Sequence, residues 1–350
     1  MGIEPDWFKS YLDNRMQKAY VNGTFSNGQA IKCGVPQGSI LGPWCYLVYC
    51  NDMPSCVDCK MVMYADDTIL ITSHRNVDQV SCILSDELQK CYRWLTDNRL
   101  SMHKGKTEAL ILSSKRKVQN TQNFTISIDN QTITPSKEVK YLGLKINNTL
   151  SGEEIVNSIV CKSTGRLRFL YRHQNLLNAN ARKILVQSLI LCHFDYAIAA
   201  WYMSLTKTNK RRLQVAQNKA VRFMLNLGPR AHIGQTELDR AGILSVNDRA
   251  RQIILHLMYD IYHGTAPDYL CQNFHHNTNR YLTRSNQNCF TVPNNRGIAS
   301  NNFNFIGSKE WNNLPNNVKL ATSKLSYKKL VRSFLKSQAH ILENMDFVYY

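Results

Sequence analysis

The sequence predicts an α+β fold in which strands and helices share the first part of the chain and helices dominate the second. Before residue 150, short apolar runs of β character are repeatedly interrupted by Gly, Pro, Asn and Asp. After Ser151, apolar residues recur at steps of three and four over long segments, which is typical of amphipathic helices. The 350 residues are 43% hydrophobic and 19% charged, a composition that allows a large core and excludes a wholly disordered chain.

Periodicity and turn residues predict the elements of the first 150 residues. In chain order we expect a helix over Trp7–Tyr20, a helix from Trp44 to about Asn51, a hairpin of Met61–Tyr64 and Thr68–Ile71, a helix from Val77 to about Asn98, and strands around Ala109–Leu112, Phe124–Ile128 and Val139–Ile146. The second helix follows a passage rich in Gly and Pro and stops near Pro54. The hairpin turns at Ala65-Asp66-Asp67, between two apolar runs.

The second part of the chain is predicted to be mainly helical. We expect helices over Glu153–Tyr171, Ala179–Tyr202, Thr206–Leu227, Asp248–His263 and Ser326–Leu342. Between them, Cys271–Asn317 is rich in Asn and Gly, which favours loops and a few strands.

The longest apolar stretch, Leu185–Met203, contains His193 and Asp195, which would be costly in lipid, so we expect no membrane span. His193 and Asp195 could be mistaken for a catalytic pair. A buried hydrogen-bonded pair is the preferred interpretation, because no nucleophile accompanies them.

The charge balance points to an anionic partner. Lys and Arg exceed Asp and Glu by 18, and residues 151–350 hold 26 basic against 11 acidic side chains. Such an excess favours nucleic acid or an acidic membrane surface. On the helix Thr206–Leu227, Arg211, Arg212, Lys219 and Arg222 lie opposite an apolar stripe and could neutralise phosphates, although a merely solvated basic face is an equal alternative.

The cysteines indicate a reducing, intracellular setting. The chain has 11 of them, an odd number too sparse for a disulfide scaffold, and its first residues lack the apolar core of a secretory signal. Two groups could in principle bind zinc, namely Cys56 with Cys59, and Cys271 with His275, His276 and Cys289. We interpret both as free thiols and surface histidines, because zinc motifs need four ligands at restricted spacing.

The segment with the clearest chemistry is Tyr64-Ala65-Asp66-Asp67. Two adjacent carboxylates at a hairpin tip repel each other, but such hard oxygen ligands suit a pair of Mg²⁺ ions. Taken alone, they could also be ordinary turn residues. Upstream, Gly34–Ser39 precedes a helix, where exposed backbone amides favour phosphate groups.

Several motifs in order resemble the reverse transcriptases of non-LTR (LINE-type) retrotransposons, with a first part most similar to the jockey branch. The matching segments are Trp7–Asn14 (WFKSYLDN), Gly34–Pro43 (GVPQGSILGP), Tyr64–Asp67 (YADD), Lys106-Thr107, Val139–Gly143 (VKYLG), His193–Tyr196 followed by Trp201, and Trp311–Pro315 (WNNLP). The resemblance implies an RNA-directed DNA polymerase, a nucleotidyltransferase that extends a DNA primer with dNTPs on an RNA template.

The resemblance also implies roles for matching residues. Asp66 and Asp67 would bind two Mg²⁺ ions, for which Mn²⁺ could substitute, and act as catalytic residues together with Lys106, which would lie beside the departing pyrophosphate. Tyr64 would stack beneath the primer end, Gln37 and Gly38 would line the nucleotide and template pocket, and Lys140 would belong to a primer grip. In a thumb, Arg211, Arg212, Lys219 and Arg222 would follow the nucleic-acid backbone.

The expected organisation is an incomplete right-hand palm with part of the fingers (1–148), a helical thumb-like region (149–230) and a C-terminal region of unknown role (231–350). Family members carry a further catalytic aspartate upstream of the helix corresponding to Trp7–Tyr20. We therefore expect a truncated polymerase that is inactive alone. Alternatives are a non-catalytic nucleic-acid-binding remnant and a decayed copy. The family implies a nuclear or cytoplasmic location, with the nucleus favoured for integration.

Overall fold

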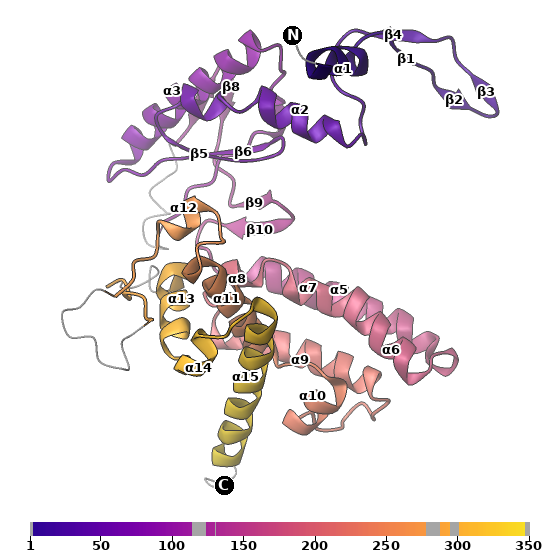
Figure 1. Ribbon diagram of the computed structural model, residues 1–350, viewed down its shortest axis with the longest axis vertical. Helices are drawn as coiled ribbons and strands as arrows, with labels where there is room; N and C mark the ends of the chain where they lie inside the picture. Colours follow the sequence, from indigo (N-terminus) through magenta and orange to yellow (C-terminus); the bar gives the residue numbers. More distant parts are fainter. Residues whose placement is uncertain (1–2, 114–123, 130, 278–287, 295–300, 347–350) are drawn as a thin grey trace. The chain divides into compact units, whose positions relative to one another are not determined.

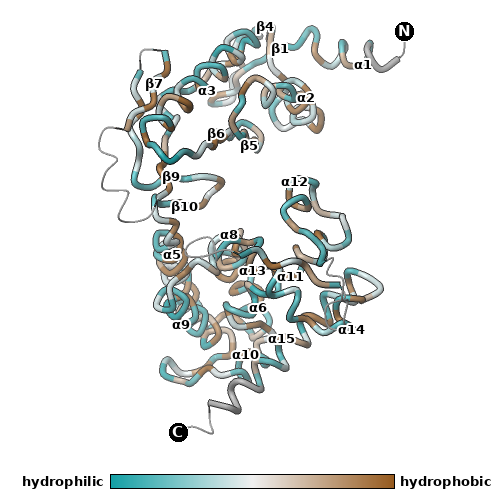
Figure 2. Tube along the Cα trace, turned by 90° about the vertical axis from the view of Figure 1, so that its left-hand side faces the viewer, coloured by the Kyte–Doolittle hydropathy of each residue, from teal (hydrophilic) through white to brown (hydrophobic). Residues whose placement is uncertain are grey.

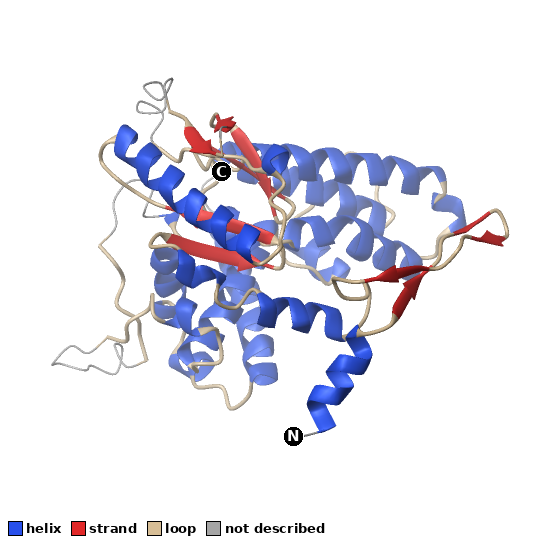
Figure 3. Ribbon diagram, turned by 90° about the horizontal axis from the view of Figure 1, so that it is seen from above, coloured by secondary structure: helices blue, strands red, loops and turns tan. Residues whose placement is uncertain are grey.

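The structure, a computed structural model, describes residues 3–113, 124–129, 131–277, 288–294 and 301–346 and divides into two compact units (Figure 1). The first unit comprises Met1–Ile111 and Lys115–Ser136, and the second comprises Leu112–Ser114 and Lys137–Tyr350. Helices and short antiparallel sheets, blue and red in Figure 3, occur together, which confirms the α+β class. The division into three functional regions stays a prediction.

The first unit alternates short strands with three α-helices in its described part. Its elements are α1 (Ile3–Leu12), β1 (Arg15–Gln17), β2 (Tyr20–Val21), β3 (Thr24–Phe25), β4 (Gln29–Ile31), α2 (Leu41–Tyr49), the 3₁₀ turn η1 (Met53–Cys56), β5 (Lys60–Tyr64), β6 (Asp67–Ile71), α3 (Val77–Asp97), the 3₁₀ turn η2 (Lys104–Lys106), β7 (Ile126–Ile128) and β8 (Gln131–Ile133). The helix expected near Trp44, the hairpin and the helix from Val77 are confirmed.

The helix predicted over Trp7–Tyr20 is wrong beyond Leu12. There the chain enters a long hairpin in which β1 pairs with β4 and, further out, β2 pairs with β3. Its tip is Asn22-Gly23, with φ angles of 49° and 81°, the left-handed values of a type I′ turn. Asn-Gly between short β runs is a strong hairpin signal, and it outweighs the weak helical periodicity before it.

The hairpin β5–β6 is packed on α3. Met61, Met63 and Leu70 lie against Cys91 and Trp94 of that helix in a small core. The strand expected around Ala109–Leu112 is wrong, because Ala109 forms only an isolated bridge with Pro135. Each of the five sheets in the described residues has two strands, so every strand has one edge without a partner strand there.

The second unit is a β-hairpin followed by helices. Its elements are β9 (Glu138–Tyr141), β10 (Leu144–Asn147), α5 (Glu153–Arg172), the 3₁₀ turn η3 (Gln174–Leu176), α6 (Ala179–Val186), the π-helical η4 (Gln187–Leu191), α7 (Cys192–Asp195), α8 (Ile198–Trp201), α9 (Lys207–Met224), α10 (Gln235–Ala241), α11 (Val246–Tyr262), α12 (Asp268–Cys271), α13 (Phe303–Asn312), α14 (Asn316–Lys319) and α15 (Lys324–Asp346).

Three expectations for this unit need correction. The strand over Val139–Ile146 is a hairpin that turns at Leu142 and Gly143, whose φ angles are 45° and 80°. The helix over Ala179–Tyr202 contains a π-helical turn and is interrupted at Ala197, whose φ is 48°. The region Cys271–Asn317, expected to be loops and strands, includes the ten-residue helix α13. The apolar residues of α13 pack into a core formed with distant helices, and local composition does not predict such packing.

One helical run, Ala179–Trp201, is long and apolar enough to cross a membrane by length and composition alone. Here Val186, Ile190 and Phe194 are buried in the protein core. Asp195, near the end of the run, is paired with Arg249. The apolar character of the run is thus used in part for packing within the unit.

The second unit has two adjoining hydrophobic clusters. One gathers the buried faces of α5, α9 and their neighbours, and the other lies among α11, α13 and α15. Along these helices hydrophobic and hydrophilic residues alternate, as the colours of Figure 2 show. Trp311, fully buried at the centre of the second cluster, is ringed by Tyr262, Phe290 and Tyr327 at centroid distances of 4.9, 5.9 and 6.1 Å.

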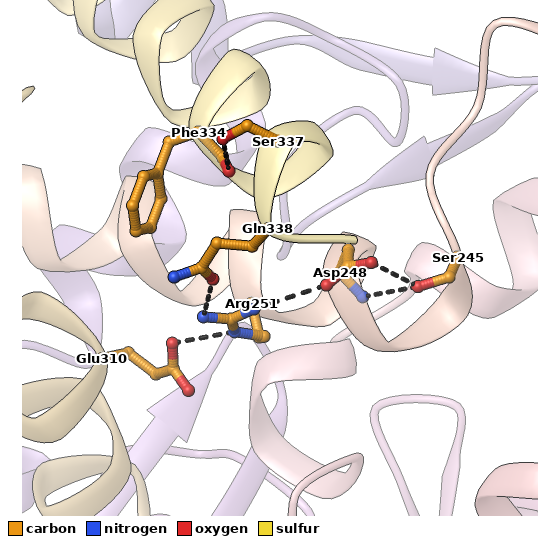
Figure 4. Close-up of polar contacts among 7 residues, drawn as sticks. All are labelled: Ser245, Asp248, Arg251, Glu310, Phe334, Ser337 and Gln338. Carbon is orange, nitrogen blue, oxygen red and sulfur yellow. Dashed lines mark hydrogen bonds and ion pairs between the residues drawn. The ribbon is translucent and has the colours of Figure 1, made fainter. Parts of the chain in front are cut away.

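A polar network fastens α11 to α13 and α15 (Figure 4). Arg251 donates from Nε to Glu310 at 2.9 Å and from its two terminal nitrogens to Gln338 at 3.1 Å and to Asp248 at 3.4 Å. Ser245 caps the start of α11, accepting from the Asp248 backbone and donating to its carboxylate. The network satisfies a largely buried guanidinium, so it orients the helices around the aromatic cluster.

We expect the second unit to lose stability in mild acid because of His256. Burial, followed by the nearby Lys328, Arg249 and Lys324, lowers its pKa from 6.5 to about 4, against a smaller opposing effect of Asp260. The folded state keeps His256 neutral, while the unfolded chain binds a proton below its ordinary pKa of 6.5. Above pH 6.5, His256 is neutral in both states and does not lower the free energy of unfolding. As the pH falls from 6.5 toward 4, only the unfolded chain gains a proton, so the free energy of unfolding decreases, by about 2 kcal/mol between roughly pH 7 and pH 5.

Urea denaturation at both pH values measures this loss. His256→Leu should flatten the dependence, while replacement of the exposed His275 by Gln should leave it unchanged. Equal pH dependence in wild type and His256→Leu would contradict the assignment.

Candidate active site and nucleic-acid interface

The paired aspartates lie at the tip of the β5–β6 hairpin. Tyr64 pairs with Asp67, so Ala65 and Asp66 form a two-residue turn. All four side chains are exposed. By the alternation of the strands, Tyr64 and Asp67 lie opposite each other on the face away from Met63, the face that does not pack on α3. The arrangement presents two carboxylates and an aromatic ring to solvent together.

The turn itself holds an unfavourable backbone geometry. Ala65 has a φ of 51°, in the left-handed region that a residue with a Cβ enters at a cost of about 1–2 kcal/mol. Glycine would avoid this cost at no loss of packing contacts, since the site is exposed. The left-handed Ala65 is the first residue of the two-residue turn, which leaves Tyr64 and Asp67 paired opposite each other.

The carboxylates meet the requirements of Mg²⁺. None of the ion pairs in the described part of the chain uses Asp66 or Asp67. Mg²⁺ is usually held by one or two carboxylates, several waters and substrate phosphates, so two exposed adjacent aspartates fit it. Among the described residues, no group of three or more His, Cys, Asp and Glu side chains converges to hold a metal by itself.

A tyrosine that the sequence does not single out lies near the aspartates. Burial and an interaction with Cys50 raise the pKa of Tyr46 on α2 to about 12, and the negative charge of Asp66 contributes a smaller part of that rise. Tyr46 is protonated near neutrality with or without this rise, so the raised pKa indicates only that the ring is partly buried and that Asp66 lies close enough to contribute. In the sequence, Tyr46 stands in an apolar helical run, which does not indicate that it lies near Asp66.

Buried Glu87 on α3 fixes the chain segment that leads into β5. Its carboxylate accepts hydrogen bonds from the backbone N–H groups of Asp58 at 2.6 Å and Cys59 at 3.2 Å, and from Lys90 at 2.7 Å. Burial by itself would raise the pKa of Glu87, but these hydrogen bonds outweigh it and the pKa is lowered. The charged carboxylate therefore anchors the base of the hairpin that carries the aspartates.

The Gly34–Pro43 segment forms the start of α2. The Ser39 hydroxyl accepts from the Gly42 backbone N–H at 3.0 Å and donates to the Pro36 carbonyl at 2.7 Å, while Tyr11 of α1 contacts it at 2.6 Å. A Cβ on Gly42 would come within 2.9 Å of the Ser39 oxygen and 3.2 Å of the Pro36 carbonyl oxygen. Glycine is needed here for close approach, and the turn holds α2 in the position from which Tyr46 reaches the neighbourhood of Asp66.

Gln37 and Gly38, the predicted nucleotide-pocket residues, lie on the exposed side of this turn. Gly38 has a φ of 83°, and a Cβ added there would meet no atom within 4 Å. The backbone at Gly38 is thus open to a ligand, although no contact in the described residues joins Gln37 to Asp66 or Asp67.

Lys106, the predicted partner of pyrophosphate, is exposed at the end of η2, and no contact in the described residues connects it to the aspartates. Its neighbour Lys104 is instead engaged, with its ammonium bound to Asp129 and placed 4.7 Å from the centre of the Tyr92 ring. The carboxylate of Asp129 raises the pKa of Lys104.

In the second unit, two of the sequence motifs come into contact. The Tyr196 hydroxyl donates to the Leu142 carbonyl, and the Tyr196 ring faces Gly143. A cavity of about 80 Å³ beside this contact is lined in part by Lys162 and His193. Lys140 is exposed on β9, directly across from Lys145, which pairs with Glu138 at 2.8 Å.

The four basic residues predicted on α9 lie on its outer arc but are not equivalent. Arg211 and Lys219 are exposed. Arg212 donates to Asn209 at 3.1 Å and to Asn157 of α5 at 2.6 Å, and Arg222 donates to the Ala231 carbonyl at 2.7 Å. Half of the predicted interface is therefore committed to holding α9 in place.

The predicted pairing of His193 with Asp195 is wrong. His193 contacts Arg166 of α5, and burial, Arg166 and Lys162 lower its pKa. Asp195 accepts two hydrogen bonds from Arg249, at 2.9 and 2.8 Å. Both residues are partly exposed. Each contacts its own arginine, and the expected buried hydrogen bond between them is not formed.

The cysteines and histidines that could in principle bind zinc contact other side chains in the described residues. His276 stacks on Phe290 at 5.0 Å, and buried Cys289 accepts from Lys319 at 3.5 Å. Cys56 and Cys59 pack in the small core beneath the β5–β6 hairpin, where burial raises the pKa of both thiols.

Comparison with known proteins agrees with the motifs. Residues 1–146 match the family described as reverse transcriptase (RNA-dependent DNA polymerase). Three Drosophila melanogaster proteins are similar over 61–62% of the chain: the probable RNA-directed DNA polymerase from transposon BS (26% identical), the RNA-directed DNA polymerase from mobile element jockey (23%), and the probable RNA-directed DNA polymerase from transposon X-element (21%).

The chain spans about a quarter of the length of these curated relatives, 24% in each case. The family match covers the whole β5–β6 hairpin with its aspartates, together with the Gly34–Pro43 turn. Residues 1–146 thus match the reverse transcriptase family, and the resemblance of the chain to the RNA-directed DNA polymerases of non-LTR retrotransposons is confirmed.

Proposed function

We propose that this chain supplies the metal-binding hairpin and part of the nucleic-acid surface of an RNA-directed DNA polymerase of a non-LTR retrotransposon. The observation that supports this most is the exposed Asp66-Asp67 pair, free of ion pairs in the described residues, within a segment that matches the reverse transcriptase family. In this proposal the first unit is the palm with part of the fingers, and α5 to α9 belong to the thumb.

The residues at the hairpin have distinct tasks in the proposed reaction. Bound Mg²⁺ would activate the primer 3′ hydroxyl and neutralise charge on the leaving pyrophosphate. Asp66 and Asp67 would hold the ions through their carboxylate oxygens, and the exposed ring of Tyr64 would support the primer end. Gln37 and the open backbone at Gly38 border the incoming nucleotide, and Lys106 is free to approach the pyrophosphate.

Primer extension tests the proposal. A polymerase that contains this chain should extend a DNA primer on an RNA template with dNTPs and Mg²⁺, and EDTA should stop the extension. RNA binding without any extension would instead support the second candidate, a nucleic-acid-binding protein without catalysis, which the basic arc of α9 favours.

The basic arc predicts a salt-dependent affinity for nucleic acid. Removing one side chain that neutralises a phosphate should flatten the log–log dependence of affinity on salt by about 0.9 on duplex. Because Arg211 and Lys219 are exposed, replacing both by Ala should flatten the slope by roughly twice that amount without loss of stability. Filter binding of an RNA–DNA hybrid from about 50 to 200 mM salt measures the slope.

Arg212→Ala with Arg222→Ala is the matched control. These changes break hydrogen bonds that hold α9, so they should lower the denaturation midpoint while changing the salt slope less. An unchanged slope after replacement of Arg211 and Lys219 would show that the arc is only solvated.

A further inference from the structure

The outer end of the hairpin made by β1–β4 carries two large aromatic rings in solvent. Tyr20 and Phe25 form a cross-strand pair next to the Asn22-Gly23 turn, and their side chains are 62% and 66% exposed. Their ring centres are 4.6 Å apart, with 41° between the ring planes. In Figure 1, β2 and β3 occupy the end of this hairpin farthest from α1.

The same face continues toward the base of the hairpin with a mixed apolar and basic surface. A Cβ on Gly28, the residue before β4, would lie 3.0 Å from the Met16 terminal methyl and 3.2 Å from the Lys18 side chain, so both side chains extend over the backbone at Gly28. Tyr20 follows Lys18 by two residues along the same extended segment, which places it on that face.

Charge on this part of the chain has one sign. From Asn14 to Asn51 the sequence contains no Asp or Glu, whereas it contains Arg15, Lys18 and Lys32. Lys18 and Lys32 are exposed and form no ion pair within the described residues. The hairpin itself therefore contributes only positive charge, and the first carboxylate before it in the sequence is Asp13, ahead of β1.

We propose that this face, Met16, Lys18, Tyr20 and Phe25, binds single-stranded nucleic acid. Unpaired bases stack on Tyr20 and Phe25, and the Lys18 ammonium neutralises the adjoining backbone phosphate. Exposed aromatic rings beside cations are the surface used for unpaired strands, because every base has a flat face and every linkage a charge. The assignment goes beyond the proposed polymerase chemistry, since it involves neither the metal ligands nor the nucleotide pocket.

A protein partner is the less favoured occupant. The two rings stand on a two-stranded ribbon, and the charged residues of this hairpin and the segment after it, Arg15, Lys18 and Lys32, are all basic. Stacking on the rings requires unpaired bases, whereas a general basic surface binds single strands and duplex alike. The two kinds of binding can therefore be told apart.

Fluorescence anisotropy with the full chain tests the proposal, using a labelled oligouridylate and a duplex of equal length, without metal or dNTPs. Tyr20→Ala combined with Phe25→Ala should weaken single-strand binding about fivefold or more per ring and leave duplex binding nearly unchanged. Val21→Ala, which changes an equally exposed residue on the opposite face of the same hairpin, should have little effect. Tyr20→Trp should retain the affinity.

A second measurement covers the case in which the double variant fails to fold. Ultraviolet cross-linking of the wild-type chain to bromouridine RNA should label the peptide that contains Tyr20 and Phe25. Unchanged single-strand affinity, or cross-links confined to other peptides, would overturn the proposal and point to a protein contact. An equal loss on duplex would also overturn it and would show binding of nucleic acid without stacking of unpaired bases. Because these assays omit metal and dNTPs, their failure is distinct from a failure of primer extension.

Discussion

Replacing Asp66 or Asp67 by Asn should reduce primer extension by more than about 100-fold, beyond the 10–100-fold loss typical of groups that only orient a metal ligand. Each substitution keeps the size of the side chain and removes one negatively charged metal ligand. The hairpin should persist, because both residues are exposed and its core contacts come from Met61, Met63 and Leu70. Extension by a polymerase containing this chain, measured across Mg²⁺ concentrations, records the loss.

RNA binding should survive both substitutions, since the basic residues are untouched. Asp97→Asn is the matched control, because Asp97 is also exposed in the first unit and lies at the end of α3. It should extend primers as the wild type does. Near-normal extension by Asp66→Asn and Asp67→Asn would remove both residues from the metal site.

Trp311→Ala should destabilise the second unit by about 3–5 kcal/mol, the usual cost of removing a large buried aromatic side chain. Trp311 is fully buried, and its indole N–H donates to the Asn288 carbonyl at 2.9 Å. The following residue strengthens the site, because the Asn312 side-chain amide exchanges two hydrogen bonds with the Phe290 backbone, at 2.9 and 2.8 Å. The WNNLP motif therefore acts through packing.

Urea denaturation followed by circular dichroism measures this loss. Trp311→Phe should cost less than Trp311→Ala, because the ring is partly retained. Trp44→Ala, at a residue that is 54% exposed in the first unit, should cost far less than either. A small effect of Trp311→Ala would show that the aromatic cluster does not determine the stability of this unit.

Elements with strong local patterns were predictable from the sequence. The helix α3 has a regular apolar face and an Asn76 cap, and the β5–β6 hairpin is formed by two apolar runs around a short acidic turn. The same holds for α5, α9 and α11. For these segments local preference and tertiary packing agree, so periodicity is sufficient.

Features that depend on distant contacts were not predictable. Glu87 lies in an amphipathic helix like many exposed glutamates, and only the fold brings it to the backbone of Asp58. Arg212 and Arg222 share an arc with Arg211 and Lys219, yet hydrogen-bond partners elsewhere in the chain separate the two pairs. Tyr46 gains its place near Asp66 from the turn that begins α2. Spacing along a helix cannot encode such partners.

The strand edges of the β5–β6 hairpin have a consequence for handling the protein. A two-stranded sheet exposes a row of backbone N–H and C=O groups along each outer side, and such rows recruit further strands from any chain that can supply them. Val62 and Ile71 are exposed on the face away from α3, and this apolar surface favours association of the hairpin with other chains. Concentrated preparations of the chain should accordingly self-associate through intermolecular β-pairing, and a charged residue at position 62 should improve solubility without disturbing the aspartates.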